Sequence, residues 1–362
     1  MADESYIQLT LEIAKRGIGK VSPNPLVGCV ITKNDKIIGA GFHTKYGDDH
    51  AEISAINSSR ENLEGSTFYV NLEPCSHYGQ TPPCVDRIIQ EKIKRVVIGT
   101  LDVNPLVSGK GVKKLKDAGI EVKVGVLEKE CEELNKFFFK FINKKLPYVT
   151  LKAAITLDGK IADINSHPEW ISSPESRRYV HSLRNKYDAV LIGANTAMID
   201  DPQLTVRHVE GRNPWRIILD SKLELPTDLK IFQKNNDKRT ILVISDTGSK
   251  KKRKIAKLEK LGVKILIIKK GHNQEIHLKS LLSKLVKLNI TSVLVEGGSK
   301  IFTSFIKQKL VDDMIVFISP KLLGDGIPVV GSLGIESIKK TFNLKLKGFE
   351  TMGSDIVAEY IL

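Results

Sequence analysis

The distribution of apolar and polar residues divides the chain into two stretches that meet near residue 145. In the first stretch, short β-rich apolar runs alternate with segments whose apolar residues recur at helical spacing. Strands are expected at 28–32, 37–41, 67–71, 95–99 and 121–125, and helices at 6–16, 51–59, 84–91, 109–118 and 128–140. This alternation predicts an α/β domain in which helices cover a sheet.

A second set of strand-like runs begins after the lysine-rich segment 143–147, which we interpret as a linker. The expected strands are 148–155, 189–193, 216–220, 240–245, 264–268, 292–296 and 314–319, and helices separate most of them. A chain of 362 residues exceeds the usual size of a single core. We therefore predict two α/β domains, 1–145 and 146–362, with no internal repeat relating them.

Composition narrows the class of protein. Hydrophobic residues make up 41% of the chain, and no apolar run approaches the length of a membrane span. The first residues, Met-Ala-Asp-Glu-Ser-Tyr, lack the basic and apolar regions of a secretory signal. The chain has four cysteines, and two of them are candidate metal ligands, which favours a reducing compartment. We expect a cytoplasmic protein without a membrane partner.

The net charge of +14 raises the question of nucleic-acid binding. Lysine supplies most of the excess, and the densest run, 250–254, opens a stretch that is typical of a helix with a solvated face. Aromatic residues make up only 6% of the chain and do not interleave with this run as a stacking platform requires. We expect no nucleic-acid partner, because phosphorylated small molecules also favour positive clefts.

The strongest chemical signal is a set of three zinc-type ligands, His50, Cys75 and Cys84, with Glu52 two residues after the histidine. Catalytic zinc sites use three protein ligands and leave a position for water, whereas structural sites use four. Bound zinc lowers the pKa of water to about 7, and a nearby carboxylate can carry the proton. The pattern is that of zinc deaminases that act on pyrimidine or purine amino groups. It predicts a zinc-dependent deaminase with Glu52 as general acid/base.

A purely structural zinc clip is the alternative, and it needs a fourth ligand. Cys29 lies in an apolar run, where a buried thiol is the default, and Cys131 lies in a charged helical stretch. His43 and His77 are the other candidates. A structural zinc clip does not explain why a carboxylate, Glu52, stands next to the ligands, so the catalytic interpretation is preferred.

In the second half, the apolar run 292–295 leads into Glu296-Gly297-Gly298-Ser299 and then into a predicted helix that extends to about residue 310. Glycines permit close approach of the backbone to a ligand, and free N–H groups at a helix start bind phosphate. Taken alone, this turn is equally consistent with a tight strand–helix connection. It differs from the dinucleotide-binding pattern G-x-G-x-x-G.

Both halves resemble one known family. Eight residues separate Cys75 from Cys84, and Pro-Asn-Pro-Leu-Val-Gly stands at 23–28. These features are similar to the deaminase half of the bifunctional riboflavin-biosynthesis deaminase/reductase. The segments 156–162, 170–172, 182–184, 188–189, 193–196, 200–207 and 295–298 resemble its reductase half.

The resemblance implies a cytidine-deaminase-like zinc domain followed by a dihydrofolate-reductase-like domain. It implies deamination of 2,5-diamino-6-ribosylamino-4(3H)-pyrimidinone 5′-phosphate, then reduction of the ribosyl chain to ribityl by NADPH. It also favours a homo-oligomer. The two rival interpretations are a nucleic-acid-editing deaminase with an accessory domain and a zinc-binding structural or regulatory protein.

The resemblance also assigns contacts in the reductase half. Its substrate contacts fall on Arg184, Leu204, Arg207 and Glu296, and arginine suits a ribose phosphate by forked hydrogen bonding. The implied NADPH contacts are Ala154, Trp170, Thr196, Asp200, Ser221, Gly298, Ser299, Lys300, Ile301, Phe302, Thr303 and Ser304.

Two roles in the reductase half have more than one candidate residue. Pro168 stands where the family usually has a serine and supplies no hydroxyl, so Ser166 or His167 is the candidate replacement. Asp200 and Lys152 are the candidate proton donors for the reduction.

Overall fold

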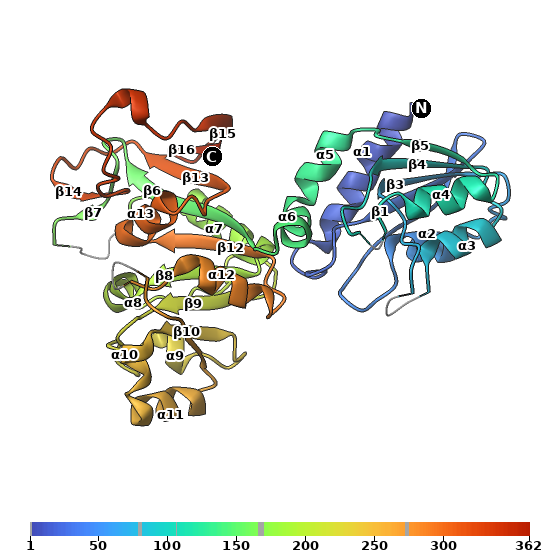
Figure 1. The fold of residues 1–362 in the computed structure, drawn as a ribbon. Coiled ribbons are helices and arrows are strands. Elements are labelled where there is room, and N and C mark those ends of the chain that lie inside the picture. Colours follow the sequence, from blue (N-terminus) through green and yellow to red (C-terminus); the bar gives the residue numbers. More distant parts are fainter. Residues whose placement is uncertain (1, 79–81, 106, 166–169, 272–274) are drawn as a thin grey trace. The chain divides into compact units, whose positions relative to one another are not determined.

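The computed structural model describes residues 2–78, 82–105, 107–165, 170–271 and 275–362 (Figure 1). The chain divides into two compact units, Met1–Leu146 and Pro147–Leu362. Helices and strands alternate in both units, so the predicted α/β class is confirmed.

The first unit is built on a five-stranded sheet of order β2-β1-β3-β4-β5. Strand β1 is antiparallel to its neighbours β2 and β3, whereas β3, β4 and β5 are parallel. Its strands are β1 (Gly28–Lys33), β2 (Lys36–Phe42), β3 (Thr67–Leu72), β4 (Arg95–Thr100) and β5 (Glu121–Val124). Its helices are α1 (Asp3–Ala14), α2 (Ala51–Ser58), α3 (Cys84–Gln90), α4 (Lys110–Asp117), α5 (Glu128–Leu134) and α6 (Lys136–Lys144), and a 3₁₀ turn, Lys15–Gly17, follows α1.

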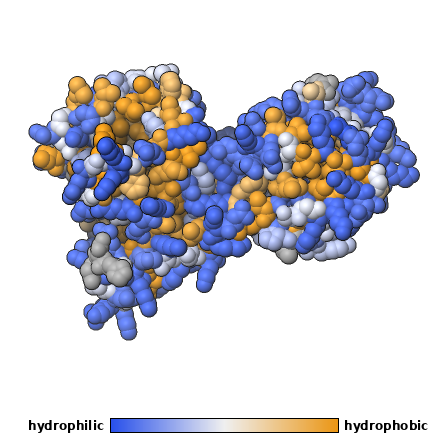
Figure 2. Space-filling view, turned by 45° about the horizontal axis from the view of Figure 1, so that its top comes forward, coloured by the Kyte–Doolittle hydropathy of each residue, from blue (hydrophilic) through white to orange (hydrophobic). Residues whose placement is uncertain are grey.

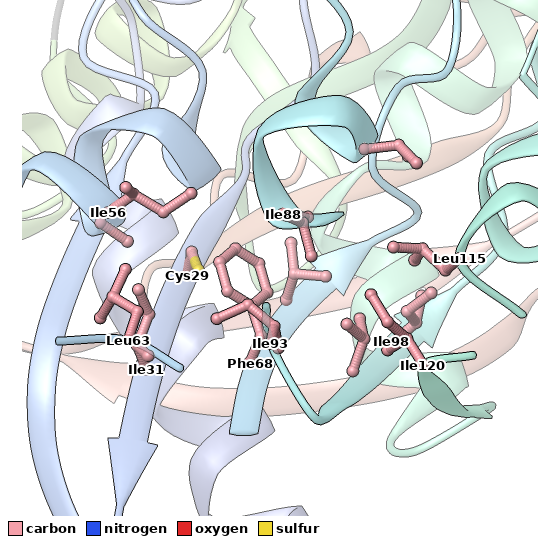
Figure 3. Packing of buried hydrophobic residues seen from close by; sticks show 14 of the residues in the cluster. Cys29, Ile31, Ile56, Leu63, Phe68, Ile88, Ile93, Ile98, Leu115 and Ile120 are labelled. Carbon is pink, nitrogen blue, oxygen red and sulfur yellow. The ribbon is translucent and has the colours of Figure 1, made fainter. Parts of the chain in front are cut away.

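Alternate residues of the central strands point to opposite faces of this sheet, and both faces are buried. On one face, Ile31, Phe68 and Ile98 pack with apolar side chains of α2, α3 and α4 (Figure 3). On the other face, Val30 and Tyr69 pack with side chains of α1 and α5. The near-continuous apolar strands therefore produce three layers, with the sheet between two helical layers.

The predicted helix 128–140 is interrupted, which corrects the sequence interpretation. Asn135 separates α5 from α6 and has a φ of −105°. Its buried side-chain amide accepts a hydrogen bond from the Leu26 N–H at 2.7 Å and donates one to the Leu26 carbonyl at 3.0 Å. The break thus serves to hold the loop before β1, and α6 continues into the segment predicted to be a linker.

The second unit contains a nine-stranded sheet of order β11-β10-β9-β8-β12-β6-β13-β16-β15. Neighbours from β11 through β13 are parallel, and β16 and β15 are added antiparallel. The strands of this sheet are β6 (Tyr148–Thr156), β8 (Ala189–Gly193), β9 (Trp215–Leu219), β10 (Thr240–Ile244), β11 (Lys264–Ile267), β12 (Ser292–Gly297), β13 (Asp313–Ser319), β15 (Lys345–Met352) and β16 (Asp355–Ile361). A separate two-stranded sheet pairs β7 (Lys160–Asp163) with β14 (Gly326–Pro328).

Helices connect most of the parallel strands of this unit, as the crossovers of a parallel sheet require. The helices are α7 (Pro174–Lys186), α8 (Ala194–Asp200), α9 (Lys230–Gln233), α10 (Asp246–Ser249), α11 (Lys252–Lys260), α12 (Leu278–Val286) and α13 (Ser299–Lys307), and a 3₁₀ turn spans Ile338–Lys340. The lysine-rich run lies at α11, where Leu258 is buried and the lysines are largely exposed.

The sequence interpretation missed the hairpin of β15 and β16. Strand β15 is the edge of the sheet, and Leu346 and Phe349 on it are 50% and 71% exposed. Its mixed apolar and charged residues gave no buried-strand pattern, because the strand is exposed over most of its length. In Figure 2, hydrophobic residues lie among hydrophilic ones on the surface of the second unit.

In the part of the chain that the structure describes, every helix is too short or too polar to cross a membrane.

We propose that each unit folds by itself, because each contains its own buried sheet. Lys144 and Lys145 are exposed at the end of α6, so trypsin should cut there first and leave two stable fragments. Mass spectrometry of a limited digest tests this expectation. Cleavage that begins inside either sheet, with no stable fragment, would contradict it.

Candidate functional site

The three zinc-type ligands meet at the starts of two helices of the first unit. His50 immediately precedes α2, Cys84 is the first residue of α3, and Cys75 lies in the loop after β3. Their ligand atoms all lie within 4.8 Å of one another. His50 Nδ1 is 3.2 Å from the Cys84 sulfur and 3.6 Å from the Cys75 sulfur. A His-Cys-Cys donor set at this spacing fits zinc, which binds nitrogen and thiolate sulfur.

The surroundings of Cys75 favour its thiolate form, which is the form that binds metal. Its pKa falls to about 4, chiefly because the Cys84 side chain hydrogen-bonds to it, and His50 adds a second hydrogen bond. The Cys84 backbone N–H also donates to the Cys75 sulfur at 3.3 Å. The hydrogen bond between the His50 imidazole and the Cys75 sulfur also raises the pKa of His50 to about 9.

Among the residues that the structure describes, no fourth ligand joins this cluster. Cys29 and Cys131 are free thiols buried within the two helix–sheet cores, and burial raises the pKa of both. The Nδ1 atom of His43 contacts the Asp49 carbonyl at 3.0 Å, and its Nε2 contacts the Asn24 amide at 3.0 Å. The structure therefore supports an open, three-ligand site and gives no support to a closed structural clip.

Glu52 lies on the first turn of α2 and is 4% exposed. Burial raises the pKa of its carboxyl to about 7, a value suited to taking and giving a proton near neutral pH. Glu52, His50 and Cys75 line one cavity of about 280 Å³. The arrangement therefore places a proton carrier beside the metal ligands.

Other polar residues on this cavity were absent from the predicted site. They include Asn24, His43, Asp102 and Asn104. Asn24 belongs to the Pro-Asn-Pro segment, and Asp102 and Asn104 lie in the loop after β4. A loop after a strand is a common place for site residues, but the sequence alone could not show which loops share one cavity.

In the second unit, the Glu-Gly-Gly turn connects β12 directly to α13. Gly297 has a φ of +135°, a conformation that favours glycine, and the Gly297–Gly298 peptide bond is cis. Among the described residues, no side chain caps α13. The Ile301 and Phe302 N–H groups donate to the Gly298 carbonyl, so the amides of Gly298, Ser299 and Lys300 are the ones that helix geometry leaves without a helical acceptor.

Several predicted cofactor contacts lie on neighbouring strands or just beyond their carboxyl ends. Thr196 follows β8, Ser221 follows β9, Gly298 follows β12, and Ala154 lies near the end of β6. A Cβ added at Gly298 would lie 3.2 Å from the Thr196 hydroxyl oxygen. Because β9, β8, β12 and β6 are adjacent and parallel, these residues gather at one edge of the sheet.

The remaining cofactor predictions differ in their surroundings. Phe302 is buried, and the Thr303 hydroxyl donates to the Ser299 carbonyl at 2.7 Å, so both side chains are engaged inside the fold. Ser304 donates to Glu275 at 3.2 Å. Trp170 is 72% exposed with the Arg177 guanidinium 4.9 Å from its ring, and Asp200 is exposed at the end of α8.

Two of the predicted substrate contacts bind each other. Arg184 Nε and Nη2 donate to the two Glu296 carboxylate oxygens at 2.7 and 2.8 Å, and both side chains are largely buried. The buried ammonium of Lys152 has a lowered pKa, mainly because of desolvation, and the nearby charges of Glu296 and Arg184 also act on it. This ion pair could not be predicted from the sequence, because it joins residues 112 positions apart.

Leu204 and Arg207 belong to one short segment. Leu204 is buried with a φ of +51°, and the exposed Arg207 donates through Nη1 to the Thr205 hydroxyl at 2.8 Å. Pro168 and its candidate replacements, Ser166 and His167, lie outside the residues that the structure describes.

Comparison with known proteins covers both units. The family model for the cytidine and deoxycytidylate deaminase zinc-binding region matches residues 1–100, and the RibD C-terminal domain matches 147–358. The riboflavin biosynthesis protein RibD of Aquifex aeolicus is 48% identical over 356 residues, covering 98% of this chain and 97% of that protein.

Solved structures agree along the whole chain. RibD of Acinetobacter baumannii has a TM-score of 0.89 at 37% identity and covers 99% of this chain and 98% of that one. A diaminohydroxyphosphoribosylaminopyrimidine deaminase/5-amino-6-(5-phosphoribosylamino)uracil reductase of Thermotoga maritima has a TM-score of 0.85 at 39% identity, with coverage of 99% and 98%.

These matches confirm a deaminase with zinc as cofactor in the first half and a reductase with NADPH as cofactor in the second. The similarity to this family is not limited to the zinc motif and the Glu-Gly-Gly turn. It extends over nearly the whole length of the chain and of its relatives. The chain belongs to the RibD family of bifunctional deaminase/reductases of riboflavin biosynthesis.

Proposed function

We propose that the first unit deaminates 2,5-diamino-6-ribosylamino-4(3H)-pyrimidinone 5′-phosphate and that the second reduces the ribosyl chain of the product. The observation that carries the first activity is the cluster of three metal ligands, His50, Cys75 and Cys84, beside a cavity that His50, Cys75 and the buried Glu52 line. The name of the Thermotoga protein describes the same pair of activities.

His50, Cys75 and Cys84 are the residues that would hold zinc. When bound, zinc makes hydroxide available near neutral pH for attack on a carbon that bears an amino group. Glu52 takes the proton from the attacking water and delivers it to the departing amine, so that ammonia leaves. Asn24, Asp102 and Asn104 offer hydrogen-bonding groups on the cavity wall to orient a polar pyrimidine ring.

For the reduction, the amides of Gly298, Ser299 and Lys300 would bind the pyrophosphate of NADPH, which supplies hydride. The partial positive charge at the start of α13 adds to this attraction. Ser221 lies beyond β9 and is a candidate contact for the 2′-phosphate. Between the two candidate proton donors we favour Lys152 over Asp200, because an ammonium carries its proton at neutral pH and Lys152 lies beside the Arg184–Glu296 pair, whereas Asp200 is exposed at the end of α8.

Arg207 is our assignment for the substrate phosphate. Its guanidinium is exposed, whereas that of Arg184 is held by Glu296. The Arg184–Glu296 pair would instead form a wall of the site, with carboxylate oxygens available to substrate hydroxyl groups. We also propose a cytoplasmic homo-oligomer. A nucleic-acid-editing role has no support from the family matches.

Replacing Glu52 with glutamine should retain zinc and lower the deaminase kcat by at least about a hundredfold, because an amide cannot carry the proton. Metal analysis and ammonia release measure the two effects, and Cys84→Ser serves as the comparison that should lose both metal and activity. A zinc-free Glu52→Gln protein would show that Glu52 is a ligand.

Replacing Gly298 with valine should raise the KM for NADPH by about tenfold or more, because a side chain there displaces Thr196 and blocks the amides. Gly348→Val is the matched control, since a Cβ at Gly348 meets nothing within 4 Å. Zinc content and ammonia release should stay unchanged in both variants. An unaltered KM for NADPH in Gly298→Val would place the cofactor elsewhere.

A further inference from the structure

The segment 205–207, which carries the arginine assigned to the substrate phosphate, is held by side chains from outside it. The Val206 N–H donates to the Asn213 side-chain oxygen at 3.0 Å. The Arg207 N–H donates to Nδ1 of His181 at 3.0 Å, and the Arg184 guanidinium reaches the Thr205 carbonyl at 3.3 Å. His181 and Arg184 are three residues apart on α7 and therefore lie on the same face of that helix, which holds the segment 205–207 in place.

The surroundings of His181 stabilise it as the acceptor of the hydrogen bond from the Arg207 N–H. Its side chain is 5% exposed, and the His208 ring packs edge-on against it with ring centroids 4.4 Å apart. Burial lowers the pKa of His181 to about 4, and the charges of Arg184, His208 and Arg207 act in the same direction. The imidazole is therefore neutral near pH 7, with Nδ1 as the acceptor and the proton on Nε2.

Removing this acceptor would leave the Arg207 N–H without the partner that fixes the backbone. Within the described part of the chain, the guanidinium hydrogen-bonds to the Thr205 hydroxyl, which belongs to the same segment, so the guanidinium moves with that segment. A phosphate contact made by Arg207 thus depends on an anchor that does not itself touch the substrate.

We propose that His181 is a positioning residue for the reductase, which fixes the Arg207 backbone so that the guanidinium meets the phosphate of the substrate. This inference rests on the proposed role of Arg207. It assigns His181 a function in recognition of the phosphorylated end and none in hydride transfer.

The test compares His181→Leu with His181→Asn in the full-length protein. Leucine fills the space without an acceptor, whereas the asparagine side-chain oxygen can take the place of Nδ1. We expect His181→Leu to raise the KM for the deaminated, phosphorylated substrate by about tenfold. The kcat and the KM for NADPH should change little, and His181→Asn should restore most of the affinity.

A second substrate separates positioning from general damage. With the dephosphorylated form of the same substrate, His181→Leu and the unaltered protein should have equal kcat/KM, because the contact that His181 supports is absent. A penalty of the same size with both substrates would overturn the inference. If the leucine variant does not fold, His181→Gln replaces it, because the glutamine side-chain oxygen lies one atom farther from the backbone than Nδ1 of histidine does. Equal KM values for the asparagine and glutamine variants would also overturn the inference.

Arg207→Ala distinguishes this inference from the proposal beneath it. If Arg207→Ala leaves the KM for the phosphorylated substrate unchanged, the assignment of Arg207 fails, and the inference fails with it. If Arg207→Ala raises that KM and His181→Leu does not, only the positioning role of His181 is wrong.

Discussion

The buried carboxylate of Glu73 holds together the wall of the cavity in the first unit. It accepts hydrogen bonds from the backbone N–H groups of Asp102, Gly109 and Val112 at 3.2, 3.0 and 3.1 Å. Glu73 stands two residues before Cys75, so the same side chain fixes the metal-ligand loop against the loop after β4 and the start of α4. A buried carboxylate is tolerated here because three donors replace its hydration.

Close packing supports the same arrangement. A Cβ at Gly111 would lie 2.4 Å from the Pro74 carbonyl oxygen, so α4 approaches the ligand loop as closely as a glycine permits. The second unit uses a related device, in which a glycine turn joins a buried strand to an uncapped helix start. In both units, rigid strands and helix starts present the reactive groups, and loops complete the site.

The sequence predicted those parts of the account that depend on local pattern. The buried strands and the glycine turn each occupy a few consecutive residues, and the metal ligands with Glu52 form short motifs whose residue types and spacing indicate their chemistry. Contacts between distant segments could not be predicted. Asn135 holds Leu26 across 109 positions, and Arg184 binds Glu296 across 112. The exposed edge strand β15 lacked the apolar pattern on which the strand predictions relied.

The central claim is that two separate reactions, hydrolytic deamination and reduction, follow one another on this chain. The most direct measurement gives the zinc-loaded protein the phosphorylated diaminopyrimidinone and records ammonia release and NADPH oxidation together. We expect ammonia to be released at the same rate without NADPH, and NADPH oxidation to begin only as deaminated product accumulates. Ammonia release that requires NADPH, or NADPH oxidation that precedes deamination, would contradict the central claim.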